Sequence, residues 1–386
     1  MFKHALDLHR LNKGKIEIKS KVRIKTRRDL SLVYTPGVAA VSKEIAKDRE
    51  KAYEYTIKSN SVAVVTDGSA VLGLGNIGAE AALPVMEGKC ALFKEFANID
   101  AFPICLRTQN ADEIVSIVKN IAPGFGGINL EDISAPRCFS IEKKLQDIGI
   151  PVMHDDQHGT AIAILAALLN SAKVAKKNIE DLSVVISGAG AAGTAVAHLL
   201  LCLGMDKNIC TSVKDITICD SKGIIYEGRK DLNEHKTELA KFTNRQRKKG
   251  TLKDALKGAD VFIGVSTGNL LTSQDIKTMN KKPIVFAMAN PIPEIYPEEA
   301  SKAAFIVASG RSDFPNQINN SLVFPGVFRG ALDARITNIN DKMKIAAAHA
   351  LANCVKPSRK KILPSTLEKN VAMKIAKAVI AASKNQ

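Results

Sequence analysis

The sequence lacks tryptophan, has few aromatic residues and contains no apolar run long enough to span a membrane. Phe, Trp and Tyr make up 5% of its 386 residues, whereas 46% are hydrophobic and 24% are charged. A membrane span needs about 20 apolar residues in succession, and the best candidate, residues 161–169, is much shorter. The N-terminus is polar where a signal peptide would be apolar. We therefore expect a globular cytoplasmic protein without a transmembrane helix.

The seven cysteines include no CxxC pair and are odd in number. We expect most of them to be small buried side chains in a reducing compartment.

The net charge of +16 lies almost entirely in two terminal segments. Residues 1–28 hold ten Lys and Arg against two acids, and residues 356–386 hold eight against one, which accounts for 15 of the 16 charges. The remaining chain is close to neutral overall. Since basic termini are usually solvated faces, the charge does not by itself predict a nucleic-acid or membrane partner.

Alternating short apolar runs and helical patterns predict an α/β protein. The expected strands are residues 61–66, 101–106, 182–187, 215–219, 261–265, 283–287 and 304–308. From residue 182 onward they alternate with helices, which is typical of a parallel doubly wound, Rossmann-type sheet. Helical spacing without strands follows at 340–351 and 367–382. We predict an N-terminal mixed α/β domain (1–158), a doubly wound domain (159–355) and a basic helical segment (356–386).

A glycine-rich loop follows the predicted strand 182–187 and opens a helix. Gly188 allows a tight turn, Gly190 allows close approach of a pyrophosphate, and Gly193 allows helix and sheet to pack closely. The predicted dinucleotide-binding loop consists of Gly188, Ala189, Gly190, Ala191, Ala192 and Gly193. Asp220, at the end of the next strand, is the expected partner of the adenosine ribose. The alternative is a close strand-helix contact without a ligand.

A second GxGxxG pattern, Gly73, Gly75 and Gly78 with Asn76 inside it, follows the predicted strand 61–66 after a gap. Two phosphate cradles in one chain are improbable. We therefore expect this loop to contact substrate or the nicotinamide end of the cofactor, with an ordinary loop as the alternative.

Four acids follow two apolar segments: Glu131 with Asp132, and Asp155 with Asp156. We place both pairs in loops. Clustered carboxylates repel one another unless they share a cation, and oxygen ligands suit Mg²⁺ or Mn²⁺. Either pair could instead cap a helix. The neighbouring histidines, His154 and His158, are expected to be structural.

Lys89 lies in an apolar stretch, where desolvation would lower its pKa towards that of a general base. A surface lysine with a buried stem is the alternative. Tyr34 precedes a Pro-Gly turn, and core packing explains it equally well.

Together these residues resemble the malic enzyme family, in its compact bacterial form, across nearly the whole chain. The matching stretches are SLVYTPGVA (31–39), VAVVTDGSAVLGLGNIGAEAALPVMEGK (62–89), GGINLEDI (126–133), HDDQHGTA (154–161), GAGAAG (188–193), MANPIPEI (288–295) and GRSDFPNQINNSLVFPGVFRGALD (310–333).

The resemblance implies oxidative decarboxylation of L-malate to pyruvate and CO2 with NAD or NADP and Mg²⁺ or Mn²⁺, and decarboxylation of oxaloacetate. It implies Lys89 as general base and Tyr34 as general acid. The implied metal ligands are Glu131, Asp132 and Asp156, supported by Asp155. The residues implied to contact substrate or nicotinamide are Asn76, Asn290, Asn319 and Asn320.

It also implies a homodimer or a dimer of dimers with small-molecule substrates. From the charge distribution we expect no nucleic-acid partner. The alternative functions are a malolactic-type enzyme, which releases lactate, or another metal-dependent 2-hydroxy-acid dehydrogenase.

Overall fold

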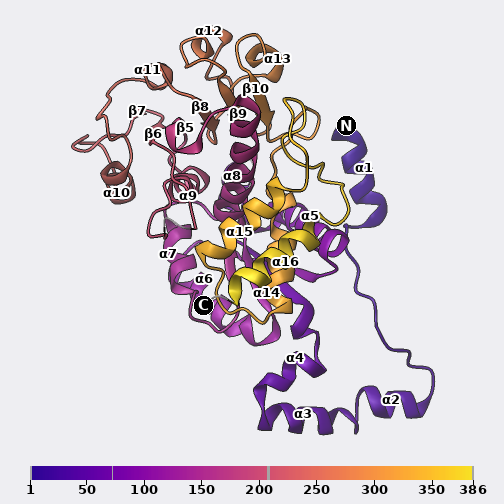
Figure 1. The fold of residues 1–386 in the computed structure, drawn as a ribbon. Coiled ribbons are helices and arrows are strands. Elements are labelled where there is room, and N and C mark those ends of the chain that lie inside the picture. Colours follow the sequence, from indigo (N-terminus) through magenta and orange to yellow (C-terminus); the bar gives the residue numbers. More distant parts are fainter. Residues whose placement is uncertain (1, 72, 207–208, 385–386) are drawn as a thin grey trace.

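A computed structural model describes the whole chain except residues 1, 72, 207–208 and 385–386. Two β-sheets, the first parallel and the second parallel except for one edge strand, are joined by the long helix α8 (Asp155–Ala175) (Figure 1). The predicted α/β class with a doubly wound second sheet is confirmed.

The first sheet has the strand order β2-β1-β3-β4, with every pair parallel. Its strands are β1 (Ser61–Thr66), β2 (Asp100–Cys105), β3 (Gly127–Leu130) and β4 (Val152–His154). The central strand β1 is buried along its whole length, as its continuous Val-rich run requires in a sheet covered on both faces.

The second sheet has the order β10-β9-β8-β5-β6-β7. Its strands are β5 (Ser183–Ser187), β6 (Asp215–Asp220), β7 (Gly223–Ile224), β8 (Val261–Gly264), β9 (Ile284–Ala287) and β10 (Ile306–Ser309). All are parallel except β7, which forms a short hairpin with β6. The chain order reverses between β5 and β8, and crevices at such switch points are where doubly wound sheets bind ligands.

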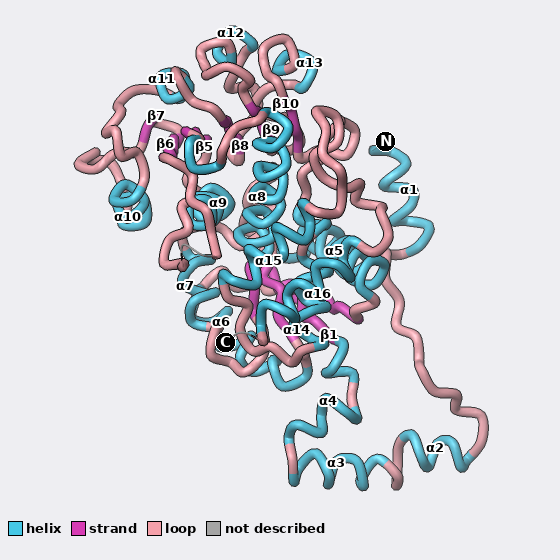
Figure 2. The backbone as a smooth tube through the Cα atoms, viewed as in Figure 1, coloured by secondary structure: helices cyan, strands magenta, loops and turns pink. Residues whose placement is uncertain are grey.

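Helices surround both sheets (Figure 2). In the first half they are α1 (Phe2–Asn12), α2 (Arg27–Val33), α3 (Val38–Lys47), α4 (Ala52–Tyr55), α5 (Ala79–Ala97), α6 (Ala111–Ile121) and α7 (Arg137–Lys144). After α8 come α9 (Ala191–Leu200), α10 (Glu234–Phe242), α11 (Leu252–Leu256), α12 (Ser273–Ile276), α13 (Pro297–Ala300), α14 (Phe324–Asp333), α15 (Asp341–Ala352) and α16 (Val371–Ser383). The 3₁₀ turns are η1 (Arg49–Lys51), η2 (Ile57–Asn60), η3 (Ala122–Gly124), η4 (Ile179–Asp181) and η5 (Asn320–Leu322).

Helix α8 is long and apolar enough, by length and composition, to cross a membrane, but 72% of that stretch is buried inside the protein. It packs against α9 and α15, so it is a core helix. The C-terminal helices return to the first half of the chain: Phe324 and Phe328 of α14 pack against Phe93 of α5, with ring centroids 4.6 and 5.5 Å apart.

Helices α2 and α3 lie apart from the rest of the molecule (Figures 1 and 2). We call residues 27–47, which contain both, the N-terminal arm. None of its residues is buried. Its exposed apolar and aromatic side chains are Leu30, Leu32, Val33, Tyr34, Val38 and Val41.

Two expectations need correction. Asp155 and Asp156 do not lie in a loop, because α8 begins at Asp155 and both occupy its first turn. Acids are favourable there, since they face the positive end of the helix dipole. Cys202 and Cys210 form a disulfide, whereas the other five cysteines are free thiols.

Candidate active site

The four predicted acids meet at one edge of the first sheet. Strands β3 and β4 are parallel neighbours, and the acids follow directly after their carboxyl ends. Glu131, Asp132 and Asp156 each place one carboxylate oxygen within 4.8 Å of the others. The Asp132 backbone adopts a left-handed φ of 54°, and its N–H donates to Asp156 Oδ2 at 2.7 Å. Backbone strain of this kind is often found at functional sites.

The acidic cluster fits a hard divalent cation. Its ligand atoms are all carboxylate oxygens, which Mg²⁺ and Mn²⁺ prefer. In addition, Asp155 Oδ1 is buried and has no hydrogen-bond partner among the described residues. A buried acceptor without a donor is costly unless a ligand satisfies it.

Lys89 extends from α5 into this cluster. Its Nζ lies 2.9 Å from Glu131 Oε1, donates to Asp155 Oδ2, and sits 4.5 Å from the centre of the Phe324 ring. Burial alone would lower the pKa of Lys89, but the negative charges of Asp155 and Glu131 raise it above its ordinary value. The expectation of a lowered pKa is therefore wrong for the site without a cation. The neighbours of Lys89 along the chain are apolar, whereas the carboxylates that raise its pKa are brought close only by folding.

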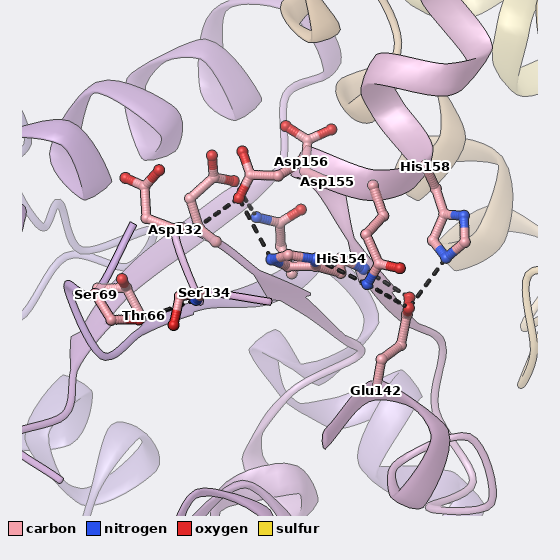
Figure 3. Close-up of polar contacts among 12 residues, drawn as sticks. Thr66, Ser69, Asp132, Ser134, Glu142, His154, Asp155, Asp156 and His158 are labelled. Atoms are coloured by element: carbon pink, nitrogen blue, oxygen red, sulfur yellow. Dashed lines mark hydrogen bonds and ion pairs between the residues drawn. The ribbon is translucent and has the colours of Figure 1, made fainter. Parts of the chain in front are cut away.

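A network of hydrogen bonds around Glu142 supports the acidic cluster (Figure 3). Glu142 of α7 accepts hydrogen bonds from the His154 backbone N–H at 2.8 Å, from Gln157 Nε2 at 3.0 Å and from His158 Nε2 at 3.0 Å. His154 Nε2 in turn lies 3.3 Å from Asp156 Oδ2. Both histidines therefore hold other residues in place, as expected.

Glu142 is a supporting residue of the site that was not predicted from the sequence. The available signal was its position on the apolar face of α7, one residue after buried Ile141 and four after buried Cys138. An acid on such a face needs hydrogen-bond donors.

The glycine-rich loop joins β5 to α9 at the switch point of the second sheet. Gly188 has a φ of 118°, and a Cβ on Gly193 would lie 1.9 Å from Gly188 O. A Cβ on Gly190 would meet no atom within 4 Å, because this residue faces a cavity of about 580 Å³. The loop geometry therefore fits a dinucleotide: a tight turn, an open face and close helix-strand packing. Ala191 and Ala192 form the first turn of α9, and Ala189 lines the cavity.

Asp220 also lines this cavity, at the end of β6. Its carboxylate is already engaged within the chain, by Arg229 Nη2 at 2.6 Å and Lys236 Nζ at 2.7 Å. Burial alone would raise the pKa of Asp220, but these hydrogen bonds lower it to about 2.

The second glycine loop reaches the Rossmann-type half of the chain. A Cβ on Gly73 would lie 1.9 Å from Asn290 O, so this loop packs directly against the backbone at Asn290. Gly75 and Gly78 have positive φ angles, and Gly78 precedes α5, which carries Lys89. Asn76 exchanges two amide hydrogen bonds with Gln109, at 3.1 and 2.9 Å.

Two further predicted residues lie near the first turns of α8. Asn319 caps η5 by accepting from the Ser321 N–H at 2.8 Å. A Cβ on Gly159 would lie 3.2 Å from Asn320 Cβ and 1.8 Å from Asp155 Oδ1, so Asn320 and Asp155 approach the same helix turn. Tyr34, in contrast, lies in the N-terminal arm with 67% of its surface exposed. Helices α2 and α3 of this arm lie away from α5, which carries Lys89 (Figure 1).

Comparison with known proteins assigns the family. The malic enzyme N-terminal domain matches residues 13–146, and the malic enzyme NAD-binding domain matches residues 157–384. This chain belongs to the malic enzyme family. Among the malic enzymes it resembles the bifunctional malic/malolactic enzyme of Bacillus subtilis, with 56% identity over 98% of this chain and 92% of that protein.

Other malic enzymes are similar over comparable lengths. The NAD-dependent malic enzyme of Geobacillus stearothermophilus is 55% identical over 96% of this chain and 77% of its own length. The crystal structure of the NAD-dependent malic enzyme from Thermotoga maritima superposes with a TM-score of 0.93 at 51% identity, covering 97% of this chain and 98% of that one.

Proposed function

We propose that this chain oxidises L-malate with NAD⁺ or NADP⁺ and decarboxylates the product to pyruvate and CO2. The observation that carries the proposal is the ion pair between Lys89 and Glu131, because Glu131 belongs to the acidic cluster with Asp132 and Asp156. In this proposal residues 1–158 hold substrate and metal, residues 159–355 bind the nucleotide, and the basic segment 356–386 completes the helical layer. We place the enzyme in the cytoplasm.

Glu131, Asp132 and Asp156 would hold Mg²⁺ or Mn²⁺. When bound, the cation supplies positive charge for the substrate oxygens and offsets the carboxylates that raise the pKa of Lys89. The loop 188–193 and the cavity beside it would hold the dinucleotide, which accepts the hydride from C2 of malate.

Lys89 accepts the proton of the C2 hydroxyl group, and Asp155 orients the Lys89 amine by accepting its hydrogen bond. The product of this oxidation, oxaloacetate, then loses CO2 and leaves the enolate of pyruvate, which needs a proton at C3. Tyr34 donates that proton in our proposal. The amides of Asn290, Asn319 and Asn320 orient the substrate carboxylates and the nicotinamide. Asn76 stabilises the second glycine loop, which faces these ligands.

Tyr34 can take this role only in an assembly of two chains. The N-terminal arm exposes six large apolar or aromatic side chains and has no buried residue, which is costly for a free monomer in water. We propose a homodimer in which the arm of each chain packs on the other, so that Tyr34 of one chain completes the site around Lys89 of its partner. A two-fold axis would make both sites equivalent.

The activity is tested by following absorbance near 340 nm with malate, Mn²⁺ and each cofactor, with pyruvate and lactate quantified at the end. Pyruvate equal to the reduced cofactor formed is the expected result. Lactate in its place would indicate the malolactic reaction, and no turnover with either cofactor would refute the proposal. Lys89→Ala, compared with wild type by circular dichroism, controls for contaminating enzymes.

A further inference from the structure

The adenosine end of the nucleotide cavity lies in a locally basic part of the chain. Residues 221–260 contain eleven Lys and Arg against six Asp and Glu, although the middle of the sequence is nearly neutral as a whole. Two of these lysines, Lys222 and Lys236, line the cavity together with Asp220 and Ser221. The relatives are named for NAD in some cases and NADP in others, so they do not decide which cofactor this chain uses.

An acid at the end of the second Rossmann strand usually selects NAD, because it binds the ribose hydroxyls and repels a 2′-phosphate. Here the charge of Asp220 is compensated. Its Oδ2 accepts from Arg229 and Lys236, and its Oδ1 accepts from the Lys222 backbone N–H at 2.9 Å. Both carboxylate oxygens already have donors, and two cations offset the single negative charge.

Arg229 is a structural partner in this arrangement. Its side chain is almost fully buried, donates to the Gly223 and Ile224 carbonyls at 3.2 and 3.1 Å, and pairs with Asp231. The guanidinium group of Arg229 is therefore held in place beside Asp220, and Arg229 does not line the cavity. Lys236 remains partly exposed and faces the cavity, and Lys222 is mostly exposed with its Nζ 3.0 Å from Asp231 Oδ2.

We propose that Lys222 and Lys236 form a binding site for the 2′-phosphate of NADP⁺. Arg229 neutralises Asp220, so the two lysines present a net positive charge to the phosphate. Ser221 also lines the cavity. Lysine ammonium groups bind phosphate strongly through charge-assisted hydrogen bonds. This inference rests on the proposed NAD(P)-dependent function and adds that the chain uses NADP⁺ at least as well as NAD⁺.

Calorimetric titration with nucleotide fragments tests the site without turnover. We expect 2′,5′-ADP to bind on the order of tenfold more tightly than 5′-AMP, and we expect the difference to shrink at high salt because Lys222 is exposed. Lys222→Gln and Lys236→Gln should weaken 2′,5′-ADP binding and leave 5′-AMP binding nearly unchanged. Lys253→Gln is the matched control, since Lys253 lies in neighbouring α11, pairs with Asp275 and does not line the cavity.

Equal affinities for the two fragments would overturn the inference, and so would an equal loss of 2′,5′-ADP affinity in Lys253→Gln. The kcat/KM ratio of NADP⁺ to NAD⁺ with malate separates this failure from failure of the proposed function. Turnover with NAD⁺ without fragment discrimination refutes only the phosphate site. Fragment discrimination without malate oxidation supports the phosphate site and refutes the function.

Discussion

Co-expression of two inactive chains distinguishes an active site shared between protomers from one built within a single chain. One chain carries Lys89→Ala and the other Tyr34→Phe, each with a different affinity tag, so that sequential purification isolates the heterodimer. Each substitution alone should lower kcat by a factor on the order of 10² to 10⁴, the usual contribution of a positioned acid or base.

Whether the arm reaches the partner chain determines how many intact active sites the heterodimer contains. If Tyr34 acts on the partner's Lys89, one site combines the two lesions and the other combines two intact residues. The heterodimer should then recover about half of the wild-type specific activity, because one of two equivalent sites is whole. If Tyr34 acts within its own chain, each site carries one lesion and the activity stays at the level of the single variants.

A second heterodimer reverses the prediction and serves as the control. A chain carrying both substitutions is paired with a wild-type chain. A shared site predicts little activity, since each site then has one lesion, whereas a site within one chain predicts about half. Recovery of activity in this pair and not in the first, or a monomer in sedimentation at assay concentration, would refute the exchange of arms.

Further predictions concern the metal cluster and its supports. Chelation should abolish malate oxidation, and added Mn²⁺ should restore it; full turnover after chelation would contradict the metal assignment. Asp156→Asn should weaken Mn²⁺ binding, measured by electron paramagnetic resonance, far more than nucleotide binding, and an equal loss of both would indicate misfolding. Glu142→Gln should weaken Mn²⁺ binding about tenfold, as loss of a residue supporting metal ligands commonly does, with NAD⁺ affinity unchanged. Asp220→Ala should raise the NADP⁺ to NAD⁺ ratio of kcat/KM, because two cations lose their compensating charge, whereas Asp231→Asn, which lies outside the cavity, should change it less.

The sequence predicted the elements that depend on local pattern. Strand β1 has the predicted bounds, and the other predicted strands agree within one or two residues at each end. Strands β4 and β7 were missed because they have three and two residues, which is too short for a period to be recognised. Strand β3 has four residues, as the predicted strand β8 does, but its sequence GINL contains Gly and Asn, which are depleted in strands. The start of α8 was also missed, because two adjacent acids followed by His158 and Gly159 look like a loop when their helical hydrogen bonds are not known.

Properties of the site that depend on charges far apart in the sequence could not be predicted in the same way. The motifs identified Lys89 and the acids separately, but the direction of the Lys89 pKa shift depends on Asp155, 66 residues away, being in hydrogen-bond contact. Asp220 is a similar case. Its position at the end of β6 predicted a partner for the adenosine ribose, but the sequence did not show that Arg229 and Lys236 already pair with its carboxylate.

In our proposal, Tyr34 acts in a site that the fold of one chain does not complete. A catalytic proton donor should be held in a fixed position near the reacting carbon. Tyr34, however, is 67% exposed and lies between α2 and α3, two helices without buried residues. The sequence around it is rich in large apolar side chains, which a permanently solvated segment would not favour. In the proposed dimer, the exposed apolar surface of the arm would supply the contact that holds Tyr34 against the second chain. Assembly and catalysis should therefore be lost together when the arm is made polar, for example by Leu32→Glu, whereas Leu367→Glu, at an exposed position outside the arm, should affect neither.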